Sequence, residues 1–375
     1  TGNCQNCKTQ FIIEPDDFGF YEKIKVPPPT WCPECQLVRR LVFRNEHNLY
    51  RKKEAMTGKE TISMYSPESH IKIYEQKTWW SDEWGSSSYG RDYDFSRPFF
   101  GQFKELMLAV PWPALINWNA VNSEFCNYST DNKNCYMVFG GDFNENCAYG
   151  TYSLHSKDSL ELYFANKHEL SYECLYSDNN YKVFFSQYTQ NCRESAFLFD
   201  CINCHNCIGC TGLRNRSYCI FNKPFSKEEY EGRAKDFDLG SFVVLEKLKD
   251  EFARSKLSRP HRFAQIIRAQ NSTGDNIYAA KNCIRCFDAS MDIEDCKDLF
   301  LAVDHVKDAM SANLVGYSTE LIYESFTIFS GSSRVFLSAV VQASHDIQYS
   351  FNISQNSSDL FGCVGLRNKQ YCILN

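Results

Sequence analysis

From residue 122 onward, hydrophobic and polar positions follow a short, fixed step. Small residues recur every 12 positions at Cys135, Cys147, Ser159 and Ser171, and Asn or Asp precedes most of them. A short aromatic or branched run follows these markers, as in Tyr136–Phe139. Turns and strands at one step predict a parallel β-solenoid with the small side chains stacked inside it. Two such segments, about 24 residues, would form one coil, and a two-sheet sandwich is the competing architecture.

The repeat region is itself duplicated. The segment Gly209–Asn222 returns as Gly362–Asn375, with Leu-Arg-Asn, Tyr-Cys-Ile and the closing Asn at the same places. Lys133-Asn134-Cys135 likewise returns as Lys281-Asn282-Cys283. Residues 122–222 and 271–375 are therefore predicted to be two copies of one solenoid unit.

The remaining segments carry helix signals. In the connector, Ser96 is a predicted N-cap with Pro98 in the first helical turn. In the linker, Ser226 and Glu229 form a capping box, and the helices of this linker are expected to cap the first unit. No such helices follow the second unit, so we expect its C-terminal edge to be open to self-association. The predicted domains are an N-terminal module (1–54), an aromatic α+β connector (55–121), the first unit (122–222), the helical linker (223–270) and the second unit (271–375).

Two C-x2-C pairs stand near the start of the chain. Cys4, Cys7, Cys32 and Cys35 offer four thiolates, and each pair places two sulfur atoms on one side of an ion. Two such turns complete the tetrahedron that Zn²⁺ prefers and leave no position for water. We therefore expect one structural Zn²⁺ in a zinc ribbon or treble clef, a module otherwise too small for a stable core. A helix that begins at the second pair would favour the treble clef.

The other cysteines and the charge bear on compartment and partners. The chain has 19 cysteines, many at the small position of the repeat, which favours buried free thiols and a reducing, cytoplasmic setting. The net charge of −6 argues against a protein that coats nucleic acid along its whole length. No segment reaches the ~18 apolar residues of a membrane-spanning helix.

A basic stretch follows the second cysteine pair. Between residues 38 and 59, seven Lys and Arg side chains oppose two Glu, which gives a local charge of +5. Basic side chains beside Tyr50 would suit phosphates and stacked bases, so nucleic acid or ribosome binding is one hypothesis. A solvated helix face or a contact with a protein partner is the other. The candidate contact residues are Arg39, Arg40, Arg44, Arg51, Lys52 and Lys53.

A second cysteine cluster lies inside the first unit. Cys201, Cys204, Cys207 and Cys210 are spaced by three, which could wrap an iron–sulfur cluster or a second metal ion. The second copy keeps the equivalent of Cys210, as Cys363, but not those of the other three. This loss favours an internal ladder of packed thiols over a metal site, and both interpretations stay open.

Several motifs resemble those of a family of uncharacterised zinc-ribbon proteins from reduced-genome bacteria. They are the run Pro28–Glu46, with its Trp-Cys-Pro-Glu-Cys, the run Tyr89–Phe100 and the Gly212–Asn215 turn, so the resemblance covers most of the chain. It implies that the four N-terminal cysteines are zinc ligands, and it implies no activity. Members of that family often place a Cys before the Thr-Gly-Lys turn, where this chain has Glu54-Ala55-Met56, so no metal role is expected there.

Three classes of function follow. A non-enzymatic scaffold or interaction protein is favoured, because the chain has no H-E-x-x-H, no nucleotide-binding glycine loop and no Ser-His-Asp order. Nucleic acid or ribosome binding through the basic stretch is an alternative. A carbohydrate-active β-helix enzyme is another, and it would need carboxylates gathered on one face, with Asp142, Asp158 and Asp178 as candidates.

Overall fold

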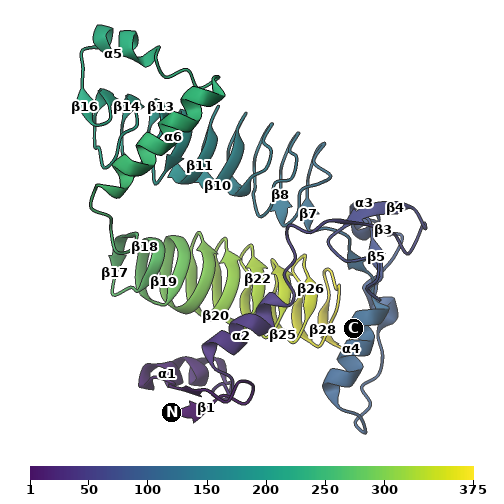
Figure 1. Cartoon of the computed structure of the whole chain (residues 1–375). Coiled ribbons are helices and arrows are strands. Elements are labelled where there is room, and N and C mark those ends of the chain that lie inside the picture. Colours follow the sequence, from purple (N-terminus) through teal and green to yellow (C-terminus); the bar gives the residue numbers. More distant parts are fainter.

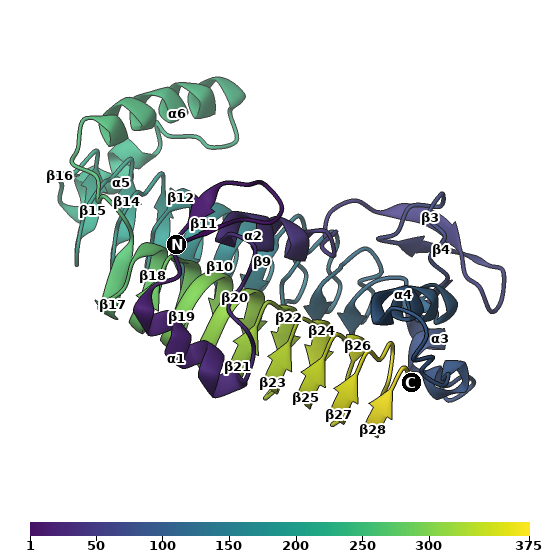
Figure 2. The ribbon, with the colours of Figure 1, turned by 90° about the horizontal axis from the view of Figure 1, so that it is seen from below.

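The computed structural model describes residues 1–375 and is mainly β, with 41% of residues in strands and 17% in helices. A β-solenoid of about 21 turns in all extends over residues 117–373. It consists of two stacks that lie side by side, and the chain runs along them in opposite directions (Figures 1 and 2). The predicted β-solenoid architecture is therefore confirmed.

The N-terminal module combines a small hairpin with two helices. Helix α2 begins at the second cysteine pair, because Cys32 is its extended N-cap and Pro33 occupies the first turn, where a missing N–H costs nothing. A helix in this position favours a treble clef. The elements are β1 (Gly2–Asn3), β2 (Gln10–Phe11), α1 (Pro15–Ile24) and α2 (Pro33–Leu41), followed by the hairpin β3 (Tyr50–Lys53) and β4 (Glu60–Ser63), which spans the boundary predicted at residue 54.

The connector is built around a helix that the sequence predicts. That helix, α4, has Pro98 rather than Ser96 as its N-cap, and Ser96 instead donates to Asp94. The indole of Trp79 is buried, so the tryptophans of this segment pack against other groups. The elements are β5 (Ile73–Tyr74), α3 (Gln76–Trp80), the 3₁₀ helix η1 (Ser86–Tyr89), α4 (Phe99–Ala109) and β6 (Trp112–Pro113).

The connector covers the C-terminal end of the second stack. Ser86 Oγ donates to the Gly365 carbonyl at 2.7 Å, and Asn375 Nδ2 donates to the Ser86 carbonyl at 3.1 Å. Gly365 has a φ of +70°, and a side chain there would crowd the Trp79 ring. A segment 279 positions earlier therefore packs on part of this end, and self-association through the rest of it stays a prediction. The last strand nevertheless keeps an exposed face, where Tyr371 is 80% exposed.

The first stack consists of short parallel strands. Paired residues in neighbouring strands are 12 positions apart, as for Leu160 with Tyr172 and Tyr172 with Phe184. The strands are β7 (Asn117–Trp118), β8 (Ser129–Thr130), β9 (Thr151–Leu154), β10 (Leu160–Asn166), β11 (Tyr172–Asp178), β12 (Tyr181–Gln187), β13 (Arg193–Ala196), β14 (His205–Ile208) and β15 (Ser217–Ile220), and the antiparallel β16 (Lys223–Pro224) pairs with β15.

Each coil has four sides of three residues. Along the stack, almost every third residue lies in the left-handed region, as do Asp200, Asn203 and Asn206 with φ of 52°, 53° and 52°. Asn, Asp and Gly enter this region most readily, and each such residue turns the chain at a corner. One coil therefore takes 12 residues, and the predicted coil of about 24 residues is wrong, because the 12-residue marker is a whole turn.

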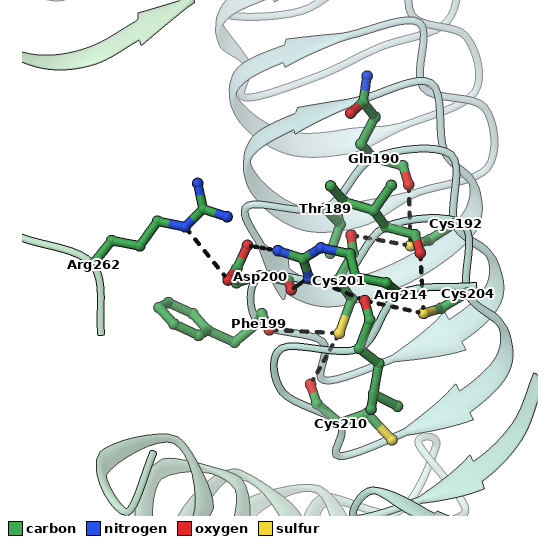
Figure 3. Close-up of polar contacts among 12 residues, drawn as sticks. Thr189, Gln190, Cys192, Phe199, Asp200, Cys201, Cys204, Cys210, Arg214 and Arg262 are labelled. Carbon is green, nitrogen blue, oxygen red and sulfur yellow. Dashed lines mark hydrogen bonds and ion pairs between the residues drawn. The ribbon is translucent and has the colours of Figure 1, made fainter. Parts of the chain in front are cut away.

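The interior of the coils is narrow and filled by small side chains. Buried Ser and Asn side chains accept hydrogen bonds from the backbone one coil later, as Ser195 Oγ does from Cys207 N–H at 3.0 Å. Buried thiols donate to backbone carbonyls, as Cys192 Sγ does to the Cys201 carbonyl at 3.5 Å (Figure 3). The predicted internal ladder of Cys and Ser is therefore present, and it satisfies backbone groups besides filling space.

Two helices follow the first stack, α5 (Lys227–Ala234) and α6 (Phe242–Leu257). The capping box predicted at Ser226 and Glu229 is present at the start of α5. Helix α6 lies against a side wall rather than across the open end, since its Phe252 contacts Phe197 at a ring distance of 5.6 Å and its Leu248 is buried. The linker thus covers both the last strand and part of one wall.

The second stack repeats the first with coils of 11 to 13 residues, as the pairs Ile266 with Ile277, Ser333 with His345 and His345 with Ser358 show. No helix of the chain is long and apolar enough to cross a membrane. Its strands are β17 (Ile266–Gln270), β18 (Gly274–Ile284), β19 (Cys286–Val303), β20 (Val306–Gly316), β21 (Thr319–Tyr323), β22 (Phe326–Phe329), β23 (Ser333–Phe336), β24 (Ala339–Gln342), β25 (His345–Gln348), β26 (Phe351–Ile353), β27 (Ser358–Phe361) and β28 (Gln370–Ile373).

A segment of residues 42–48, here called the strap, passes between the two stacks. Its Arg44 guanidinium lies 5.7 Å from the rings of both Tyr152 in the first stack and Phe300 in the second. Arg44 is paired with the buried Glu46 at 2.8 Å, and the Tyr152 hydroxyl donates to the same carboxylate at 2.9 Å. The strap therefore links the stacks through one buried charge pair and its aromatic neighbours.

Candidate metal centre and the predicted site residues

Four cysteines from two distant turns meet in the N-terminal module. The sulfur atoms of Cys4, Cys7, Cys32 and Cys35 all lie within 4.8 Å of one another, a geometry that no other group of His, Cys, Asp or Glu side chains in the chain reaches. Three of the four are buried and Cys7 is exposed. The set could hold one metal ion, with its ligands supplied from both cysteine pairs as predicted.

Backbone groups around the cluster favour thiolates. Burial raises the pKa of the Cys4 thiol, but the N–H groups of Cys32, Cys7 and Asn6 outweigh it and lower that pKa to about 6. Cys32 is an exception, because burial raises the pKa of its thiol to about 12. Asn6 Nδ2 donates to Cys35 Sγ at 3.4 Å, and Cys32 N–H donates to Cys4 Sγ at 3.3 Å. These donors suit sulfur atoms that carry negative charge, which is the form that binds a metal.

Helix α2 holds the module against the wall of the second stack. Arg40 Nε donates to Asn313 Oδ1 at 2.7 Å, and Gln36 Oε1 accepts from Ser311 Oγ at 2.8 Å. Burial lowers the pKa of Arg40 to about 10, with Glu324 among the groups that oppose this change. Arg39 pairs with Glu324. The polar face of the helix is thus the buried one.

Helix α1 adds a second set of contacts to the same stack. Lys297 Nζ pairs with Asp17 at 2.6 Å, and Lys23 Nζ pairs with Asp308 at 2.7 Å. Tyr21 and its neighbour Ile24 pack with Tyr323 and other side chains of the wall. Because α1 lies between the two cysteine pairs and α2 begins at the second, the metal site sits where it can fix both helices on the stack.

The apolar side of α2 faces outward. Val38 is 65% exposed and Val42 is 78% exposed, whereas Arg40 is only 5% exposed. An amphipathic helix usually buries its apolar residues, here Leu37, Leu41 and Val42, whereas α2 buries Gln36 and Arg40. The reason is that the wall of the second stack presents Asn and Ser side chains at this contact.

The six predicted basic residues therefore separate into two groups. Arg39, Arg40 and Arg44 make contacts within the chain, so they do not form a free basic face. Lys52 Nζ donates to the carbonyls of Ser66 and Ser69 at 3.0 Å. Arg51 and Lys53 remain exposed, with Arg51 paired to Glu60. Nucleic acid binding stays a prediction, and it now depends on the hairpin β3–β4.

The second cysteine cluster occupies four successive sides of one coil. Cys201, Cys204, Cys207 and Cys210 all point inward and are 0% exposed. Each sulfur donates to a backbone carbonyl, as Cys201 does to that of Phe199 at 3.5 Å (Figure 3). Their spacing of three is the length of a side of the coil. A second metal at this place stays a prediction, without the tight sulfur geometry of the N-terminal set.

The three candidate carboxylates lie apart. Asp158 accepts from Asn146 at 2.8 Å and Asp178 accepts from Asn166 at 2.8 Å, both within ladders of stacked turn residues. Asp142 and Asp178 share one column through Leu154 and Asn166 and are three coils apart, or ~14 Å at the usual strand spacing. This exceeds the ~5–9.5 Å between the paired carboxyl groups of glycosidases. Asp142 and Asp178 are therefore too far apart to form such a pair.

Comparisons with known proteins identify no family for this chain. No protein-family model matches the chain. No curated protein matches it either. A solved structure from Desulfovibrio desulfuricans G20, for which an acetyltransferase activity has been suggested, aligns with 66% of this chain at 11% identity and a TM-score of 0.13. The match spans 64% of that protein, and a similarity this low carries no argument about function.

Proposed function

We propose that this chain is a non-enzymatic scaffold protein with one structural Zn²⁺ in its N-terminal module and a protein-docking wall on its first stack. The observation that carries the zinc assignment is the closed set of four sulfur ligands, Cys4, Cys7, Cys32 and Cys35. Four thiolates in a tetrahedron suit Zn²⁺ and leave no open position for substrate, which fits a structural role. This also agrees with the resemblance to zinc-ribbon proteins of reduced-genome bacteria.

The zinc would fix the module on the second stack. The helices α1 and α2 contact that stack through ion pairs, hydrogen bonds and the apolar cluster around Tyr21 and Ile24, while the apolar cluster at the cysteines themselves is small. Without metal, weak hydrogen bonds such as that from Cys32 N–H to Cys4 Sγ would join the two cysteine pairs, so we expect the helices to come away from the wall. All 19 cysteines are free thiols, which supports a reducing compartment such as the cytoplasm.

The docking wall follows one column of aligned residues along the first stack. The far half of the column, from Phe184 to Ile220, packs with Tyr230 of α5 and Leu248 of α6. The near half is free of such a cover, with Tyr136 at 44% and Leu160 at 44% exposed. Strand pairing joins the column without a break, and its residues are Tyr136, Ala148, Leu160, Tyr172, Phe184, Ala196, Ile208 and Ile220.

The continuity of this column supports a helical protein partner. Helix α6 covers the far half with apolar side chains and places Lys249 5.5 Å from the Phe185 ring. The near half offers Tyr149, 55% exposed, together with the exposed Glu161 and the half-buried Glu173. An amphipathic partner helix with basic side chains beside its apolar face would continue the contact that α6 already makes.

A peptide of residues 241–258, which contains α6, is a defined probe of this wall. We expect the labelled peptide to bind the full chain in a fluorescence anisotropy titration. The double variant Tyr136→Ser, Tyr149→Ser should weaken binding at least tenfold. Phe287→Ser, a change at a 46% exposed aromatic residue of the second stack, should leave binding unchanged. Equal affinity for the double variant and the original chain would contradict the docking wall.

A further inference from the structure

A cavity of about 630 Å³ lies between the two stacks. Aromatic side chains from both stacks line it, among them Tyr152 and Phe164 of the first, 4.7 Å apart, and Tyr317 and Phe329 of the second, 5.7 Å apart. Trp118 also lines the cavity. Its volume and mixed apolar and polar wall match those of small-molecule sites in proteins.

One carboxyl group in this wall is held from both stacks. Asp142 of the first stack accepts a hydrogen bond from the Tyr317 hydroxyl of the second at 3.0 Å. Its other oxygen accepts from the Thr130 N–H at 2.8 Å. These two bonds fix the carboxyl group at the junction of the stacks, and neither donor carries a positive charge.

No cation in the chain compensates this carboxyl group. The cavity wall contains Asp131 and Asp142 but no Lys, Arg or His. A carboxylate that is removed from water without a cationic partner is unfavourable, so the wall offers strong binding energy to a positive group that enters it. The same wall would repel phosphates and other anions.

Two further polar groups in the wall lack partners. Thr327 is 3% exposed, and its Oγ1 has no hydrogen-bond partner in the chain. Asn166 Oδ1 is likewise buried without one. Both residues line the cavity. Buried polar groups are rarely left unsatisfied, so these two indicate a place where a ligand or solvent supplies hydrogen bonds.

We propose that this cavity binds a small organic cation, with its ammonium group paired to Asp142 and its apolar part against the aromatic rings of both stacks. Aromatic faces attract ammonium groups, and quaternary ammonium ligands are recognised in this way. The proposal is independent of the zinc site and of the docking wall. A neutral sugar would use the same rings but would gain nothing from the charge of Asp142.

Choline and 3,3-dimethylbutan-1-ol test the charge directly, because they share one shape and differ by a carbon in place of the cationic nitrogen. In ligand-observed NMR with the full chain, we expect choline to bind and the alcohol to bind at least tenfold more weakly. Asp142→Asn should reduce choline affinity at least tenfold and leave the alcohol unchanged. Asp158→Asn, at a carboxylate outside the cavity, should leave both unchanged.

Two outcomes would overturn the proposal. One is equal binding of choline and the alcohol, or no binding of choline to the original chain. The other is unchanged choline affinity in Asp142→Asn. Tyr317→Phe gives a second readout, since it removes the hydroxyl that donates to Asp142 but keeps the ring. We expect it to shift choline affinity less than Asp142→Asn does, and thermal unfolding of each variant shows that it is folded.

Discussion

Asn222 and Asn375 close the last coil of the two stacks with the same pair of hydrogen bonds. Asn222 Oδ1 accepts from Thr211 N–H at 2.8 Å, and its Nδ2 donates to the Thr211 carbonyl at 2.8 Å. Asn375 makes the same two bonds with Val364, at 2.7 and 2.8 Å. The side chain stands in for the backbone of a further coil, so the duplication seen in the sequence extends to how each stack ends.

Replacing Asn222 by Ala should therefore loosen the end of the first stack. Two hydrogen bonds are lost and the Thr211 peptide groups are left unpaired, which should cost about 1–3 kcal/mol in denaturant unfolding. Asn222→Asp keeps the acceptor oxygen and loses the donor, so it should cost less than Ala. If the Ala variant is as stable as the original chain, the closing role of Asn222 is wrong.

Cys204 tests whether the inner thiols fill space or hold a metal. Cys204→Ser keeps a small hydrogen-bond donor, so we expect a loss of no more than about 1 kcal/mol and an unchanged metal content. Cys204→Leu adds volume to a narrow coil and should cost about 1–3 kcal/mol or more. Metal analysis and denaturant unfolding of both variants provide the measurements. A metal ion lost in Cys204→Ser would show that the inner cluster binds metal.

Arg40 tests how the N-terminal module is held. Arg40→Met removes the hydrogen bond to Asn313 and leaves that buried side chain without its partner, so detachment of the module should become easier by about 1–3 kcal/mol. Hydrogen exchange of the α2 amides should speed up while the strands of the stacks keep their protection. Lys53→Met, at an exposed position, is the matched control. Unchanged exchange in α2 would contradict this role of Arg40.

Asp142 should make stability depend on pH. Burial raises the pKa of its carboxyl group from 3.8 to about 6, and nearby Asp131 adds to the rise while Tyr317 and the Thr130 N–H oppose it. A raised folded-state pKa contributes stability that is complete below pH 3.8 and is lost as pH rises through 6. Asp142→Asn avoids this loss, so it should be more stable than the original chain at pH 7, by at most about 3 kcal/mol.

Thermal or denaturant unfolding between pH 4 and pH 7 measures this difference. The advantage of Asp142→Asn should shrink toward pH 4, where the original carboxyl group is already protonated. Asp158→Asn serves as the control, with no pH-dependent advantage expected. An advantage of the same size at both pH values would mean that the charge of Asp142 is not its cause.

The periodic residues and the clustering of the four N-terminal cysteines could be predicted because both signals are local in the sequence. The step of 12, the duplication and the pairs at Cys4–Cys7 and Cys32–Cys35 require no knowledge of distant contacts. The number of residues in one coil could not be predicted, because the corners of a coil are defined by backbone conformation and not by residue type. Tyr176 and Phe185 lie at corners with φ of 49° and 52°, where bulky residues are not expected.

Contacts between distant segments explain the other differences. Arg40 is buried because Asn313, 273 positions away, meets it, and nothing in the helix sequence indicates this. Ser86 covers Gly365 in the same way. The cavity likewise lies between the two copies and is lined by both. Its Asp142 was a candidate residue because it is a carboxylate, whereas nothing in the sequence marks Tyr317 of the second copy. The second copy supplies part of the cavity wall, so neither copy forms the cavity alone.

Metal analysis of the purified full chain by mass spectrometry tests the central claim most directly. The account predicts about one zinc per chain, lost when Cys7→Ser and Cys35→Ser are combined, and unaffected by Cys204→Ser. In the double variant the module should also become sensitive to protease while the two stacks resist it. A chain that carries no zinc when folded, or that keeps its zinc in the double variant, would contradict a structural zinc site at Cys4, Cys7, Cys32 and Cys35.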